Sequence, residues 1–257
     1  MDVGDDAADG GAVSLGRAVI AAAPSAAAYD PAVLSLTGWW RADGASGYDD
    51  SSGVWYGVAS AGSSSGRNLT EATNFPSAGT AVNGHTPPDF DGSNDVLANA
   101  TAISTMLTAS AWFGWWLVNI DAIATSSGTS YSNDVIMNDS GAYWGIHLSS
   151  ASGGLVYAYQ WDGAEKAVSA AIGTGAWTLI CARYDGTNLR LKVESGTVQT
   201  VAAGNISTTT GTIQCGYNVA TAYNGRMADI GLMASAGSDA LFDDIKEYVN
   251  DRYSLSL

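Results

Sequence analysis

The sequence predicts an all-β domain built as a two-sheet antiparallel jelly-roll sandwich. Three observations carry this prediction. Short apolar segments of strand length follow one another at regular spacing, and no helix-length periodic segment interrupts them. The 31 glycines, with abundant Ser, Thr and Ala, are typical of a chain with many turns. Nine tryptophans and twelve tyrosines, against four phenylalanines, are amphipathic aromatics that suit half-buried sheet faces.

Residues 1–33 come first and are predicted to form an extended arm that anchors the protein to an assembly. The arm is rich in Ala, Gly and Asp, and its candidate contact residues are Asp2, Asp5, Asp6, Leu15, Val19 and Ile20. Burial of the three aliphatic side chains gives about 1.5–3 kcal/mol each. Ordering about thirty residues costs about 1–2 kcal/mol per residue. We therefore expect a partner subunit with basic residues to hold the arm, by strand addition or in a groove.

The sandwich domain is predicted to span residues 34–257. It opens with "LSLTGWWRADG" and continues as a Gly-, Ser- and Asn-rich loop region from Asp43 to about Asp89, with one short strand at Val54–Val58. Regularly spaced strands follow. Their predicted ranges are Val96–Ala98, Ser110–Ile120, Asp134–Asn138, Tyr143–Leu148, Leu155–Trp161, Lys166–Ala170, Leu179–Tyr184, Leu189–Val193, Thr197–Val201, Thr212–Tyr217 and Gly225–Met233.

The clearest hairpin joins the strands on either side of Asp185–Asn188. Asp and Asn tolerate left-handed backbone and Gly adopts it freely, so these four residues are typical of a hairpin loop. The second strand has a period of two, which places apolar and charged side chains on opposite faces. We expect the first set buried and the second in water: Leu189, Leu191 and Val193 against Arg190, Lys192 and Glu194.

The last element is predicted to be one amphipathic helix of about 13 residues, docked on the sandwich. Leu241, Ile245, Tyr248 and Val249 recur at helical spacing. Ser238 or Asp239 is the expected N-cap.

Four motifs in this order resemble the concanavalin A-like lectin/glucanase superfamily, in its laminin G-like branch. They are "FDGSNDVL" (90–97), "ASAWFGWWL" (109–117), "WTLICARYDGTNLRLKVESG" (177–196) and "YNGRMADIGLM" (223–233). The resemblance covers residues 34–257 and implies a jelly-roll fold, which carries lectins, hydrolases and structural modules alike. The opening "LTGWWRADG" resembles proteins carried on bacteriophage particles.

Charge and composition disfavour several classes of partner. The net charge of −15 disfavours nucleic acid and anionic membrane surfaces. Residues 1–12 are acidic, so we expect no signal peptide. The apolar stretch Ala18–Ala28 is too short to span a bilayer. Cys181 and Cys215 are predicted to be buried free thiols, with a cross-strand disulfide as the alternative.

No catalytic constellation can be named, so we expect the protein not to be an enzyme. The hydrolases of the resembling superfamily use a Glu-x-Asp-x-x-Glu strand. The four glutamates here are scattered, and no two fall at that spacing. His147 is predicted to be a sheet residue and His85 a loop residue, and no zinc spacing or phosphate-binding loop occurs.

Two kinds of binding site stay open. Laminin G-like domains often hold one Ca²⁺ at the rim, and Asp91, Asn94 and Asp95 are candidate ligands, as are Asp134, Asn138 and Asp139. The alternative is that these residues make turns. Trp115, Trp144 and Trp161 are candidates for stacking on sugar rings, with a core role as the alternative. In each adjacent aromatic pair of residues 112–116, we expect one ring in the core and the other partly exposed.

The favoured function is a non-enzymatic structural protein of a virus particle, such as a capsid decoration, tail or fibre component. It would be made in the host cytoplasm and displayed on the virion surface, as a homo-oligomer bound to capsid or tail subunits. The alternative is a glycan-binding, lectin-like module, and a glycoside hydrolase is the remote third class.

Overall fold

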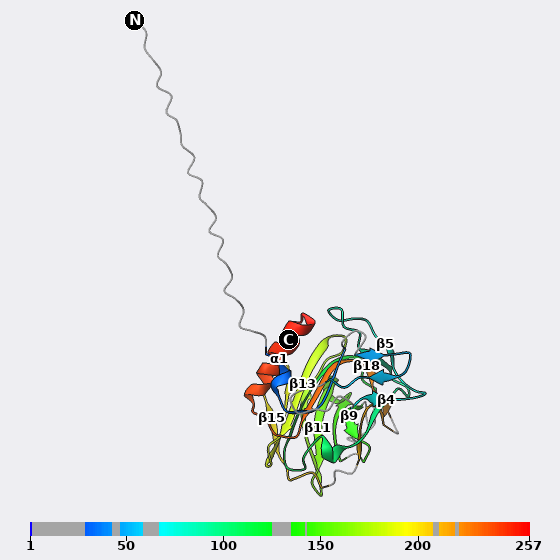
Figure 1. Cartoon of the computed structure of the whole chain (residues 1–257). Coiled ribbons are helices and arrows are strands. Elements are labelled where there is room, and N and C mark those ends of the chain that lie inside the picture. The colour runs from blue at the N-terminus through cyan, green and yellow to red at the C-terminus, as the bar shows by residue number, and fades with distance from the viewer. Residues whose placement is uncertain are drawn as a thin grey trace.

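The computed structural model describes residues 1, 29–42, 47–58, 67–124, 135–141, 143–207, 211–218 and 221–257. Two antiparallel sheets pack face to face, and the C-terminal helix lies on the outside of one of them (Figure 1). The predicted jelly-roll sandwich is therefore confirmed. Within the described residues, no helix is long and apolar enough to cross a membrane.

The helix-covered sheet has eight strands in the order β15-β14-β13-β8-β18-β6-β5, and β1 also pairs with β18. We call it the inner sheet, because both of its faces are covered. Its strands are β1 (Leu36–Arg41), β5 (Ser77–Ala78), β6 (Pro88–Asp91), β8 (Trp112–Ala122), β13 (Trp177–Tyr184), β14 (Asn188–Val193), β15 (Gln199–Ala202) and β18 (Asn224–Met233).

The other sheet, which we call the outer sheet, has ten strands in the order β12-β11-β10-β9-β16-β7-β4-β3-β2, and β17 pairs with β16. Its strands are β2 (Tyr48–Asp49), β3 (Val54–Trp55), β4 (Leu69–Thr70), β7 (Leu97–Ala102), β9 (Val135–Asp139), β10 (Trp144–Ser149), β11 (Leu155–Trp161), β12 (Glu165–Ala171), β16 (Thr212–Asn218) and β17 (Thr221–Ala222). The helices are η1 (Pro31–Val33), η3 (Ile103–Thr105), η4 (Ala151–Gly153) and α1 (Ala240–Tyr253).

The strands from β7 onward lie close to their predicted ranges, and β11 matches its range fully. The prediction was wrong for the region from Asp43 to Asp89, which was expected to be loop with one strand. That region contains β2, β3, β4, β5 and the first half of β6, and all but β6 are two residues long. Two residues are too few to show a period of two, so their pairing comes from the neighbouring strands.

The main hydrophobic core lies between the two sheets. Large aromatic side chains from both sheets fill it, and their exposed fractions are 1% or less: Trp40, Trp55, Phe90, Trp112, Trp116, Trp144, Tyr184 and Tyr223. Trp144 packs edge-on against Trp112, with ring centroids 5.5 Å apart. Interlocked rings of this size fix the sheets at one separation and register.

A second apolar layer covers the outward face of the inner sheet. Helix α1 contributes Leu241, Ile245, Tyr248 and Val249, and all four are buried as predicted. Their partners include Trp39, Phe113 and Trp115, which are at most 1% exposed. The expectation that one ring of each adjacent pair is partly exposed was therefore wrong, because the helix covers the face that was expected to meet water.

Residues 29–34 also belong to this layer. Tyr29, Ala32 and Leu34 pack against it, Pro31 is buried, and the Asp30 carboxylate accepts a hydrogen bond from the Ala32 amide at 2.9 Å. Three of the last five residues of the predicted arm, Tyr29, Pro31 and Ala32, thus pack on the sandwich.

In the hairpin of β13 and β14, apolar and charged side chains lie on opposite faces as predicted, but the charged face is not open to solvent as expected. Leu189 and Leu191 are fully buried as predicted, whereas Val193 is only half-buried. On the opposite face, Arg183 and Arg190 pair with Asp239 at 2.7 and 2.6 Å. Lys192 pairs with the Asp243 carboxylate at 2.5 Å. Asp239 is the helix N-cap residue, yet its side chain makes no capping hydrogen bond because it holds the two arginines instead.

Asp229 of β18 joins the helix to the sheet by hydrogen bonds. Its carboxylate is fully buried and accepts from Tyr248 at 2.6 Å and Tyr253 at 3.1 Å, both on α1. The Trp39 and Trp115 indoles also donate to it, each at 3.0 Å. Burial raises the pKa of Asp229 to about 6, although the hydrogen bonds oppose the rise.

The two cysteines are free and buried, as predicted. Cys181 lies on β13 of the inner sheet and Cys215 on β16 of the outer sheet. Burial raises the pKa of both thiols, which keeps them protonated and unreactive at neutral pH.

Candidate functional site

Trp161 is the one tryptophan with a large exposed fraction among the described residues, at 38%. Trp115 and Trp144, the other two candidates for sugar stacking, have no exposed surface. That interpretation was wrong for both. Trp115 lies beneath α1, and Trp144 lies in the core between the sheets. Neither ring has a face that a sugar could reach.

The exposed indole ends a row of aromatic rings on β11. Val156 and Ala158 point into the core, so the alternating residues Tyr157, Tyr159 and Trp161 share the outward face of the outer sheet. We call these three residues the aromatic strip. Sequence reasoning missed the two tyrosines, although the alternation in "LVYAYQW" was the available signal.

Small and acidic residues flank the strip on β12. The antiparallel register places Tyr157 opposite Ser169, Tyr159 opposite Ala167, and Trp161 opposite Glu165. Directly opposed side chains lie about 4.5–5.5 Å apart at Cβ. Glu165 brings a carboxyl group next to the exposed indole, whereas Tyr159 is only 5% exposed.

His147 lies on the other side of the strip, on β10. Its ring packs edge-on against Tyr159, with centroids 5.3 Å apart, and it lies over Gly145. A side chain at position 145 would collide with this imidazole. His147 is 1% exposed, and burial lowers its pKa to about 3, so the ring is neutral at physiological pH.

Backbone hydrogen bonds fix the turn that carries Trp161. Its amide donates to the Tyr143 carbonyl at 2.9 Å, and its carbonyl accepts from the Ser207 amide at 2.8 Å. The Asp162 carboxylate accepts from the Gly204 amide at 2.6 Å and the Ala164 amide at 3.2 Å. These contacts hold the backbone of Trp161 in place before any ligand arrives, which reduces the entropy cost of binding.

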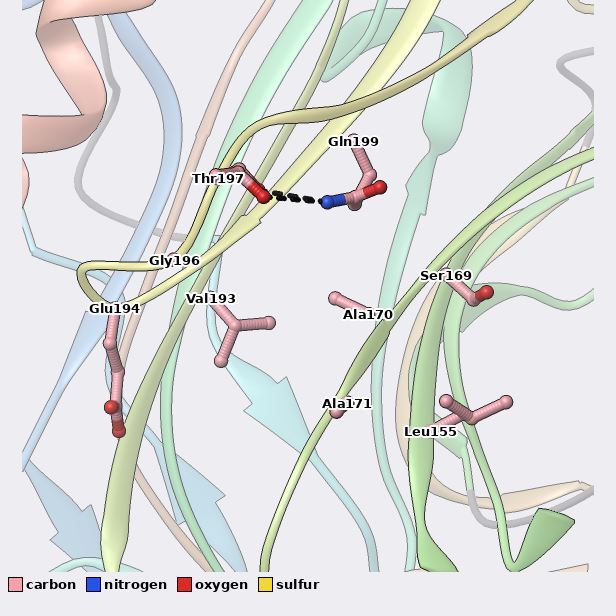
Figure 2. Close-up of a pocket in the computed structure, with 9 residues that line it drawn as sticks. All are labelled: Leu155, Ser169, Ala170, Ala171, Val193, Glu194, Gly196, Thr197 and Gln199. Carbon is pink, nitrogen blue, oxygen red and sulfur yellow. Dashed lines mark hydrogen bonds between the residues drawn. The ribbon is translucent and has the colours of Figure 1, made fainter. Parts of the chain in front are cut away.

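A pocket of about 520 Å³ lies where the edge strand β12 of the outer sheet meets β14 and β15 of the inner sheet. In Figure 2, Ala170 and Val193 point toward one another, whereas Ser169 and Leu155 point away from Val193. The Gln199 amide donates to the Thr197 hydroxyl at 2.9 Å across the rim. Leu155 and Ser169 are part of both the pocket lining and the outward face of β11 and β12, so the pocket adjoins the Tyr157 end of the strip.

The candidate calcium ligands form a turn held by its own side chains. The Asp91 carboxylate accepts from the Ser93 amide at 2.7 Å, and the Asp95 carboxylate accepts from the Asp91 amide at 2.8 Å. The Asn94 amide donates to Asn74 at 3.0 Å. These contacts match the turn alternative. Among the described residues, no group of three or more His, Cys, Asp or Glu side chains could hold a metal ion.

Asp139, another candidate ligand, accepts from the Tyr143 and Trp144 amides at 2.6 and 3.2 Å. Asp134 lies outside the described residues. The predicted arm contacts also lie outside them: Asp2, Asp5, Asp6, Leu15, Val19 and Ile20.

No protein family and no curated protein matches the chain in sequence. Solved structures match it in shape. A sialidase from Trypanosoma rangeli, in complex with 2,3-difluorosialic acid, has a TM-score of 0.59 at 11% identity over 91% of this chain. The binding domain of botulinum neurotoxin DC, in complex with SialylT, has a TM-score of 0.50 at 11% identity over 77% of this chain. The mouse laminin alpha1 chain, domains LG4-5, aligns at a TM-score of 0.43 over 56% of this chain at 15% identity.

The chain covers 36% of the sialidase and 48% of the toxin fragment. At these identities the likeness shows the fold alone. The chain has a concanavalin A-like sandwich fold, in agreement with the two antiparallel sheets of the structure.

Proposed function

We propose that this sandwich is a glycan-binding, lectin-like module and that the aromatic strip is its binding face. The observation that carries the proposal is Trp161, a large indole exposed at the end of a row of rings on a backbone fixed by hydrogen bonds. One face of a sugar ring presents C–H groups, and these pack on the negative face of an aromatic ring. The flanking carboxylate and hydroxyl of Glu165 and Ser169 can accept hydrogen bonds from sugar hydroxyls.

Fold likeness adds weaker support. The sialidase and the toxin domain are both in complex with sugar compounds in the matching structures. Because the same sandwich carries many functions, this is an argument by analogy and stands behind the exposed indole.

Binding without cleavage is the second part of the proposal. A retaining or inverting glycosidase needs one carboxyl that donates a proton and a second that attacks or activates water. Asp162, adjacent to Trp161, has a lowered pKa because the Gly204 amide donates to it, so it is a poor proton donor. We expect a reducing-sugar assay to detect no hydrolysis of bound oligosaccharides. Release that disappears in a single Asp or Glu variant would contradict this.

The binding test compares Trp161→Ala with Val33→Ala on an array of immobilised glycans. Val33 is also exposed, at 70%, but lies in η1 near the helix-covered face of the inner sheet. We expect Trp161→Ala to weaken binding at least about fivefold, since stacking on one aromatic ring is worth on the order of 1–3 kcal/mol. Val33→Ala should bind like the parent protein. Equal binding by both variants would reject the strip as the site.

We also propose, from the resemblance of "LTGWWRADG" to proteins of bacteriophage particles, that the module is displayed on a virion by its N-terminal arm. Residues Trp39 and Trp40 within that opening are buried core residues of β1. The virion role therefore depends on the arm, and its test is the truncation described in the Discussion.

A further inference from the structure

Basic side chains are distributed very unequally in this molecule. The chain has ten Lys and Arg residues. Of the nine that the structure describes, eight lie outside the strands of the outer sheet: Arg41, Arg67, Arg183, Arg190, Lys192, Arg226, Lys246 and Arg252. Arg17 is outside the described residues. The described strands of the outer sheet therefore contain one basic residue, Lys166 of β12.

Lys166 is on the opposite face of β12 from the aromatic strip. It pairs in register with Gln160, whose side chain points inward and accepts from the Trp112 indole at 3.2 Å. Glu165, the neighbour of Lys166, is on the outward face opposite Trp161. The ammonium of Lys166 also lowers the pKa of Asp162, so its positive charge interacts with a carboxylate of this chain.

The other titratable groups that the structure places next to Tyr159 carry no positive charge at physiological pH. His147 is buried beside Tyr159 and neutral at physiological pH. Asp139 is close enough to Tyr159 to raise that phenol's pKa, after burial itself. The exposed indole therefore has one acidic residue in register with it on β12, Glu165, in a protein with a net charge of −15.

An acidic sugar would bind weakly to such a face. Recognition of a carboxylate by a protein normally uses Arg or Lys, because a charge-assisted pair compensates the loss of water around the anion. Here the ligand's carboxylate would meet the carboxyl group of Glu165 instead. Two like charges a few ångströms apart disfavour binding, and unpaired charge is a common basis of discrimination.

We infer that the strip selects neutral oligosaccharides over acidic ones, and this inference rests on the proposed glycan-binding function. The ligand places one sugar on Trp161, next to Glu165 of β12.

The test measures affinity for one neutral oligosaccharide that binds on the array and for the same oligosaccharide with a terminal sialic acid, by titration calorimetry at pH 7. We expect the neutral ligand to bind at least about tenfold more tightly in dilute buffer. The gap should narrow as salt screens the carboxylates. Equal or tighter binding of the sialylated ligand, lost in Trp161→Ala, would overturn the inference and leave the glycan-binding function standing. If no ligand on the array binds, the proposed function itself fails.

Two variants of equal net charge test whether the local carboxylate is the cause. Glu165→Gln removes the charge next to Trp161, and Glu247→Gln removes one from the exposed side of α1. We expect Glu165→Gln to raise affinity for the sialylated ligand about 3–10-fold, as loss of one nearby like charge does. Glu247→Gln should change it less than twofold. Equal effects of the two variants would mean that overall charge, and not the strip, discriminates.

Discussion

Asp229 links helix α1 to the inner sheet through buried hydrogen bonds. Four donors from three elements converge on one carboxylate with no exposed surface. Such a group is stable only while its hydrogen bonds stay complete, because an unsatisfied buried carboxylate is costly. Its pKa of about 6 puts its ionisation in a range that is easily reached in solution.

The stability of the fold should therefore depend on pH through Asp229. Its folded pKa of about 6 lies above the ordinary value near 3.9, so the folded state favours the protonated form. This contribution is fully present below about pH 4, falls as the pH rises through about 6, and is absent above that. A shift of about two units corresponds to about 3 kcal/mol. We expect urea unfolding at pH 4 to 7 to show this loss in the parent protein and not in Asp229→Asn. Parallel pH curves for the two proteins would contradict it.

Leu191 tests the packing between the sheets. It is fully buried on β14 in the main core. Leu191→Ala should lower the free energy of unfolding by about 2–5 kcal/mol, through lost burial and the cavity left behind. Denaturant titration measures this, with Val33→Ala as a surface control expected within about 0.5 kcal/mol of the parent. A loss under 1 kcal/mol would mean that Leu191 is not in a packed core.

Helix α1 is the element whose role the sequence predicted least completely. Its apolar face was readable from the helical period of Leu241, Ile245, Tyr248 and Val249. Its polar contacts were not, because Asp239 and Asp243 meet arginines and a lysine about fifty residues away in the sequence. Tertiary pairing of this kind has no local pattern.

The same limit applies to the candidate site. Trp115, Trp144 and Trp161 all lie on strands, and only tertiary packing distinguishes them. Helix α1 covers Trp115, the inner sheet covers Trp144, and Trp161 is at the end of the outward-facing row on β11. The strip's two tyrosines follow a period of two that is visible in the sequence. Which side of that alternation faces outward depends on sheet pairing, which the sequence does not show.

Asp239 and Asp243 should differ in their effect on the helix. Asp239 binds two arginines, and the Arg183 side chain is only 9% exposed. Asp239→Asn should therefore cost about 1–3 kcal/mol of unfolding free energy, since it leaves a nearly buried guanidinium poorly paired. Asp243 is 69% exposed and pairs with one lysine, so Asp243→Asn should cost under about 1 kcal/mol. Thermal unfolding of the two variants side by side measures the difference, and a reversed order would show that the paired arginines do not hold the helix.

At the scale of the whole molecule, the ion pairs and the covering helix lie on one side of the sandwich, against the inner sheet. The inner sheet is covered by the outer sheet on one face and by α1 with residues 29–34 on the other. On that covered side, Arg183 and Arg190 form ion pairs with Asp239, the N-cap residue of α1. Lys192 forms an ion pair with Asp243 of α1. The outward face of the outer sheet keeps aromatic and neutral polar side chains with acids at one end. On that face Trp161 is exposed, whereas His147 and Tyr159 are buried.

Removal of residues 2–28 tests the predicted arm. Because residues 29–34 already pack against the inner sheet, we expect the truncated protein to melt within a few degrees of the full chain. We also expect it to lose co-sedimentation with its assembly, since the acidic tip and the aliphatic residues behind it are the predicted anchor. Full occupancy of the truncated protein would reject the anchor. A protein that no longer folds would place residues 2–28 within the domain.

The pairing of β1 with β18 has a consequence for how the protein is made. The ribosome delivers β1 early, but its partner strand begins only at Asn224, and α1 follows later still. Until then β8, with nine consecutive buried residues from Trp112 to Ile120, has neither its neighbour β18 nor its helical cover. A nascent chain that stalls before Asn224 would present this apolar strand to other chains, which favours aggregation. Rapid completion of translation, or a chaperone bound to β8, would then decide the yield of folded protein.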